Sequence, residues 1–167
     1  MLDEFEVVRK KAVEIALAEA KKNTVEVGAQ NRGERIDVYL RNANALNQGA
    51  AADKAGLPWC GMFIYYCYSQ AAKQLGKILP FRAENLWGGS NLKNWCDANP
   101  QKILKSSLLP GDIYIMKSYH IGMVIEPLDH YYLVKTIDGN QSGVNKGGNS
   151  LRKRERNIFD MLMVIRI

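Results

Sequence analysis

The sequence predicts an α+β fold in which an antiparallel sheet carries helices on one side. Helical periodicity dominates the first half, because apolar residues recur at helical spacing within Glu4–Lys22 and again in the segment from Met62 to Leu75. From Pro110 onward the chain becomes β-branched, aromatic and partly alternating. Helices followed by strands, rather than alternating with them, are typical of the α+β class.

The segments between and after the two helices are predicted in order. Asn23–Leu57 is polar and rich in Gly, Asn and Ala, so we expect mostly loop, with a short helix around Arg35–Leu40. Gly76 provides a C-cap for the second helix. A short helix is expected at Leu92–Ala98 within an otherwise irregular stretch. Strands are expected at Asp112–Lys117, Ile121–Glu126, Tyr131–Ile137 and Met161–Ile167.

Composition limits the classes of protein to consider. The chain has 167 residues and is 47% hydrophobic and 24% charged, which fits one globular domain. It contains no apolar run long enough for a membrane span, and Met1–Lys11 lacks the apolar core of a signal peptide. The net charge of +6 favours an anionic partner: nucleic acid, a membrane surface or an acidic wall polymer.

Cys60 is the first candidate functional residue. It follows Pro58-Trp59 and begins the second predicted helix, where unpaired backbone N–H groups and the helix dipole are expected to lower a thiol pKa. The same residue also fits an inert core position, because its helical stripe contains other buried-type residues: Ile64, Cys67 and Ala71. Three cysteines argue against a disulfide framework, and we expect Cys67 and Cys96 to be inert core residues.

A cysteine hydrolase also needs a histidine, and the chain has only two. His130 follows Pro127 in an evident turn, so a solvated surface role is expected. His120 opens a predicted strand beside Gly122, whose missing side chain leaves room for another group. His120 alone fits a structural role as well as that of a base.

Strand pairing brings His120 together with polar residues of the next strand. If Glu126 faces Tyr132 in an antiparallel hairpin, then His120 faces Asp138, whereas in the neighbouring even register it faces Asn140. Both registers put the three polar side chains on one face, and an odd register would separate them. We favour Asp138 as the direct partner of the imidazole and Asn140 as support for a loop or a substrate contact.

Three sequence blocks resemble those of CHAP domains. They are Pro58-Trp59-Cys60-Gly61-Met62-Phe63 with Tyr66-Cys67-Tyr68-Ser69-Gln70-Ala71, Pro110-Gly111-Asp112-Ile113 with His120-Ile121-Gly122-Met123-Val124, and Thr136-Ile137-Asp138-Gly139-Asn140-Gln141-Ser142. They resemble the family's "PWCAxFVxWCYxQA", "PGDIV…HVGIV" and "TIEGNTS" blocks, in family order.

The resemblance implies a papain-like (NlpC-type) α+β fold with amidase or endopeptidase activity on peptidoglycan. It implies Cys60 as nucleophile and His120 as base. Asp138 and Asn140 stand where the family has glutamate and asparagine, so either could contact the ring. The implied organisation is a single domain, 1–167, with a helix and loop extension (1–54) and a catalytic core (55–167).

Partners and delivery follow from the same resemblance. We expect a monomer that acts on the murein peptide, with no cofactor, no nucleic acid and no membrane insertion. We also expect no metal, since no acidic calcium loop is present. Without a signal peptide, the enzyme would reach the periplasm or wall by secretion-system injection or by phage lysis through a holin. Injection would make it an antibacterial effector toxin with a cognate immunity protein.

Other classes remain open at this level. A non-catalytic wall-binding module is the main alternative to an enzyme. The basic stretch Lys146–Arg156 fits a nucleic-acid-binding module or a solvated face. A zinc site is disfavoured because CxxC and HxxxH spacings are absent; its ligands would be Cys60, Cys67, Cys96 and His120. Trp87 and Trp95 fit either a substrate groove or the core.

Overall fold

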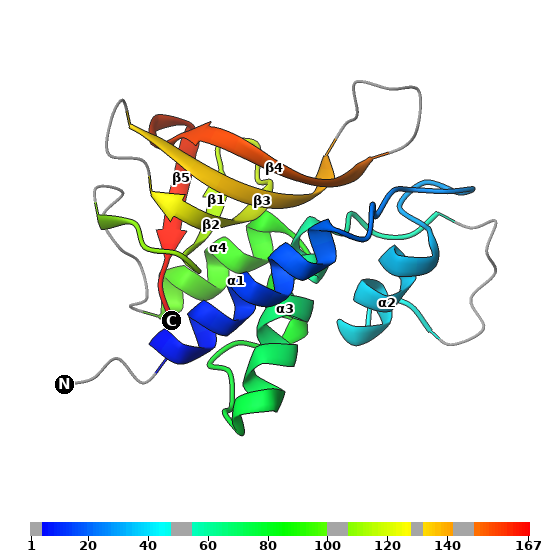
Figure 1. Ribbon diagram of the computed structural model, residues 1–167, viewed down its shortest axis with the longest axis horizontal. Helices are drawn as coiled ribbons and strands as arrows, with labels where there is room; N and C mark the ends of the chain where they lie inside the picture. The colour runs from blue at the N-terminus through cyan, green and yellow to red at the C-terminus, as the bar shows by residue number, and fades with distance from the viewer. Residues whose placement is uncertain (1–4, 48–54, 100–106, 128–131, 142–148) are drawn as a thin grey trace.

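Helices lie on one face of an antiparallel sheet in the computed structural model (Figure 1). It describes residues 5–47, 55–99, 107–127, 132–141 and 149–167, and within them there are four α-helices and a five-stranded sheet. The helices are α1 (Glu6–Ala20), α2 (Glu34–Asn42), α3 (Cys60–Leu75) and α4 (Gly89–Ala98). The strands are β1 (Ile113–Met116), β2 (Ile121–Pro127), β3 (Leu133–Gln141), β4 (Ser150–Asn157) and β5 (Met161–Ile165). The predicted α+β class is confirmed.

Helix α3 is the centre of the helical layer. Its predicted stripe of Cys60, Ile64, Cys67 and Ala71 is buried. Helices α1 and α2 pack against it and share its core through residues such as Ala12, Ala16 and Leu40. Gly76 ends α3 with a φ of 63°, the left-handed conformation that favours glycine at a C-cap. The predicted helices are therefore present, with ends shifted by a few residues.

A buried carboxylate joins α1 to the two helices beside it. Glu19 is 3% exposed and accepts hydrogen bonds from Arg35 Nε at 2.6 Å and from the Tyr39 hydroxyl at 2.7 Å. Arg35 also donates to the Tyr66 hydroxyl on α3 at 2.7 Å. Burial alone would raise the Glu19 pKa, but hydrogen bonds from Arg35, Lys22 and Tyr39 outweigh it, so the pKa is lowered.

The strands lie in the order β4-β3-β2-β1-β5, with each neighbouring pair antiparallel. Strand β4 is missing from the prediction, because Lys146–Arg156 was interpreted as a basic stretch. Its described part pairs with β3, with Thr136 opposite Arg154. Arginines occupy alternate positions along β4, so the stretch lacks the apolar alternation that identifies a strand. The described part of this stretch therefore forms a strand that the sequence pattern does not predict.

The β2–β3 hairpin has the second of the two predicted even registers. Met123 pairs with Ile137 and Val124 with Thr136, and continuing this register sets His120 opposite Asn140. The predicted pairing of Glu126 with Tyr132, and hence of His120 with Asp138, is wrong. The register shifts between Val124 and Glu126, and the latter pairs with Lys135.

The two faces of the sheet have different surroundings. Ile115, Ile121 and Ile137 point into the main core shared with the helices. Tyr114 and Val124 belong to a smaller cluster on the opposite face. The site lies at the start of β2, where α3 begins, between the main core and the smaller cluster.

Candidate functional site

The Cys60 thiol lies where the start of α3 meets the start of β2. A side chain on Gly61 would collide with the Leu86 carbonyl and with Ile121, so this glycine permits the close approach. The backbone N–H groups of Ile121 and Gly61 partly offset the effect of burial on the pKa of this thiol. Ile121 directly follows His120, so the start of α3 packs against the strand position next to the histidine.

The predicted low pKa of Cys60 is contradicted. Burial raises the pKa of this thiol, which is only 7% exposed, and the N–H groups of Ile121 and Gly61 lower it by less. The charge of Asp138 raises it further. The N–H groups at the helix start therefore do not outweigh burial, and the resting form is the neutral thiol.

His120 is a partly buried imidazole. Its Nε2 lies 3.9 Å from Asp138 Oδ2 and 2.7 Å from the amide nitrogen of Gln141. Burial lowers the pKa of His120; Asp138 raises it in part, whereas Arg156 and Arg154 lower it further. The ring is therefore neutral near pH 7 and can accept a proton.

Asp138 is fully buried on the sheet face that points away from the helices. The Tyr114 hydroxyl donates to Oδ1, and Arg156 Nε donates to Oδ2 at 3.1 Å. A side chain on Gly122 would collide with both the carboxylate and the Tyr114 hydroxyl. The expectation that Gly122 leaves room for another group is thus confirmed, and that group is Asp138.

Asn140 does not share the face of His120 and Asp138, so the prediction of one shared face is wrong, whereas the expected support of a loop fits its contact with Asn149. Its φ of 57° is left-handed, and the β3–β4 register shifts by one residue between Asp138 and Gln141. This bulge breaks the alternation. The Asn140 side chain instead accepts a hydrogen bond from Asn149 at 2.7 Å, and Gln141 contacts the ring.

Three residues of this cluster are absent from the sequence-based prediction: Tyr114, Gln141 and Arg156. Tyr114 lies on β1 and carries no motif signal. Gln141 lies next to Asn140 in the third family-like block, but only the bulge turns it toward His120. Arg156 lies within the basic stretch, where the sequence does not distinguish it from the neighbouring cationic residues.

The remaining described candidates are buried or packed against the core. Cys67 is fully buried, which raises its pKa well above the ordinary value, and Cys96 is also buried. Trp87 donates to the Ala43 carbonyl at 2.8 Å, and Trp95 packs edge-on against a phenylalanine, which fits the core interpretation. His130 lies outside the described residues.

Metal-ligand clusters were also considered. Among the described residues, no three His, Cys, Asp or Glu side chains gather as a metal site. The four residues considered for zinc thus form no such group.

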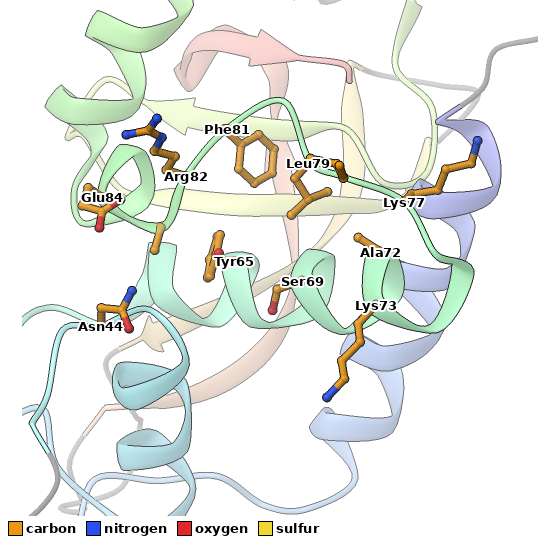
Figure 2. A pocket seen from close by; sticks show the side chains of 12 residues that line it. Asn44, Tyr65, Ser69, Ala72, Lys73, Lys77, Leu79, Phe81, Arg82 and Glu84 are labelled. Carbon is orange, nitrogen blue, oxygen red and sulfur yellow. The ribbon is translucent and has the colours of Figure 1, made fainter.

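A groove of about 620 Å³ lies along α3 (Figure 2). Tyr65, Ser69, Leu79 and Phe81 line it, and the chain from Lys77 to Glu84 runs over the helix as its other wall. Neither Cys60 nor His120 lines this groove. The candidate catalytic cluster is therefore a separate feature of the molecule.

Comparison of the chain with protein-family profiles, curated proteins and solved structures finds no match. Within the described parts of the chain, no helix is both long and apolar enough to cross a bilayer. The basis for a functional proposal is the proximity of His120 to Asp138 and the packing of the start of α3 against the start of β2.

Proposed function

We propose that this protein is a cysteine hydrolase that cleaves amide bonds of bacterial peptidoglycan, built on a papain-like (NlpC-type) fold. One observation carries the proposal: Gly61, next to Cys60, packs against Ile121, next to His120, and His120 Nε2 lies 3.9 Å from the buried carboxylate of Asp138. Thiol, base and orienting group are the parts that acyl transfer to sulfur needs.

The resting state of this site is a neutral thiol beside a neutral imidazole. The pKa of Cys60 is raised by burial and that of His120 is lowered by burial, so neither group is charged near pH 7. His120 therefore acts as a general base when substrate arrives, rather than as the cation of a preformed ion pair.

The reaction then proceeds in two steps. His120 takes the thiol proton as sulfur attacks the amide carbonyl, and the C–N bond breaks as His120 returns this proton to the leaving amine. Water next attacks the thioester, giving the acid and restoring the thiol. The backbone N–H of Cys60 is a donor for the oxyanion.

Gln141 affects the first step. Its amide nitrogen can only donate, so the hydrogen bond to Nε2 requires the neutral ring. Any proton transfer to Nε2 has to break this bond. Gln141 thus favours the neutral base until substrate binds.

The charge of the chain suits a wall substrate. A net charge of +6 attracts anionic wall polymers, and this attraction weakens as salt rises. The murein peptide is the proposed substrate, and an injected effector form would need a cognate immunity protein that blocks the site.

Single substitutions test the proposal. Purified sacculi are incubated with the wild type, Cys60→Ala, His120→Ala and His130→Ala, after circular dichroism has shown that each is folded. We expect the first two variants to lose almost all release of soluble fragments and His130→Ala to match the wild type. Full activity in folded Cys60→Ala would exclude a cysteine mechanism.

A further inference from the structure

A chain of polar contacts crosses the sheet beside His120. It begins at Tyr114 on β1, passes through Asp138 on β3 to Arg156 on β4, and returns through Gln141 to the ring. Asp138 is the centre of this chain, and each of its oxygens has a donor.

Arg156 contacts two residues. Its Nε and Nη2 donate to Asp138 Oδ2 at 3.1 and 2.5 Å, and Nη2 also donates to Gln141 Oε1 at 2.9 Å. The arginine side chain is 18% exposed and the aspartate is fully buried. A buried carboxylate requires such a partner, because an unpaired charge away from water is strongly unfavourable.

The contact to Gln141 also orients its amide. Because the guanidinium can only donate, it holds the amide oxygen toward β4. The amide nitrogen then points to His120 Nε2, 2.7 Å away. Arg156 therefore reaches the ring by two routes, through the aspartate charge and through the amide.

We propose that Arg156 is a positioning residue of the site: it balances the charge of Asp138 and turns Gln141 toward His120, so that two opposed charges act on the ring. The importance of this role for catalysis rests on the proposed function. The contacts themselves exist without any substrate.

The groups that influence His120 come from several elements. Asp138 raises its pKa, whereas Arg156 and Arg154 lower it, and burial contributes the largest lowering. Tyr114 bonds to the same carboxylate, and Cys60 lies across on α3. Removing Arg156 should therefore raise the pKa of His120, and removing Asp138 should lower it.

Nuclear magnetic resonance titration of the ring tests this directly. In a His130→Ala background, His120 supplies the one imidazole signal of the chain. We expect Arg156→Met to raise its titration midpoint by about one unit and Asp138→Asn to lower it by a similar amount. Arg156→Lys, which keeps the charge, should lie close to the parent.

Lys153→Met is the matched control, because it removes one exposed cation from the same strand and should leave the midpoint unchanged. If Arg156→Met does not fold, Gln141→Met takes its place; it removes both the amide donor to His120 and the acceptor of Arg156, and it should raise the midpoint. Shifts in the same direction for Arg156→Met and Asp138→Asn, or no shift in a folded Gln141→Met, would overturn the proposal.

The titration does not depend on turnover, so the two proposals fail separately. Opposed shifts in a protein that never digests sacculi would support the role of Arg156 and refute the hydrolase. Digestion by the wild type, together with an unchanged His120 midpoint in folded Arg156→Met, would support the hydrolase and refute the role of Arg156.

Discussion

Substituting Gly122 with alanine tests how closely Asp138 packs over β2. A Cβ at this position would lie under 3.0 Å from both Asp138 Oδ1 and the Tyr114 hydroxyl. The two groups are hydrogen-bonded to each other and buried, so neither can move into solvent. The carboxylate has to shift and break that bond.

The expected cost is about 3 kcal/mol of unfolding free energy. Loss of a buried hydrogen bond to a charged group contributes about 1.5–3 kcal/mol, and overpacking contributes about 1–3 kcal/mol. Gly88→Ala is the control, because Gly88 is extended and a Cβ there would meet nothing within 4 Å. Its cost should be about 1 kcal/mol or less.

Urea denaturation measures both variants, with sacculus digestion as the second readout. Tyr114→Ala in the Gly122→Ala background removes both Tyr114 atoms, the hydroxyl and Cζ, that would lie under 3.0 Å from the new Cβ, so the double variant should lose less stability than the sum of the single losses. A Gly122→Ala protein within about 0.5 kcal/mol of the wild type, with its activity unchanged, would refute the close packing of Asp138 against β2.

Three further predictions concern the thiol, the buried carboxylate and metal dependence. Alkylation of Cys60 by iodoacetamide should keep rising through the alkaline range, because burial raises its pKa, whereas Cys60→Ala should label slowly; a plateau near neutral pH would contradict this. Glu19→Gln should cost about 2 kcal/mol at pH 7, because it removes the charge paired with Arg35. Since the folded pKa of Glu19 is lowered, this difference should vanish as pH falls through that pKa, and a difference that persists in acid would contradict the assignment. Hydrolysis of sacculi should survive chelation by EDTA, and loss of folding restored by zinc would favour a structural metal instead.

Periodicity explains why the helices could be predicted. The stripe from Cys60 to Ala71 is apolar or small throughout, and Gly76 supplies a clear end signal. Strand β4 has no comparable signal, because arginines occupy the positions that apolar residues normally take on the covered face of a strand.

The site could be predicted only in part, because its details depend on contacts between distant segments. Motifs identified Cys60, His120 and Asp138. In the structure, His120 lies 3.9 Å from Asp138, and the start of α3, where Cys60 lies, packs against the start of β2. The left-handed Asn140 reverses the roles of two adjacent polar residues, which strict alternation cannot predict. The raised pKa of Cys60 depends on packing against β2, so its position at a helix start was insufficient.

Mass spectrometry of digested sacculi tests the central claim most directly. We predict that wild-type protein releases fragments in which each cleaved amide has gained one water, giving a new amine and a new carboxylate, and that folded Cys60→Ala releases none. Intact sacculi after incubation with folded wild-type protein, or the same fragments from Cys60→Ala, would contradict the assignment of a cysteine peptidoglycan hydrolase.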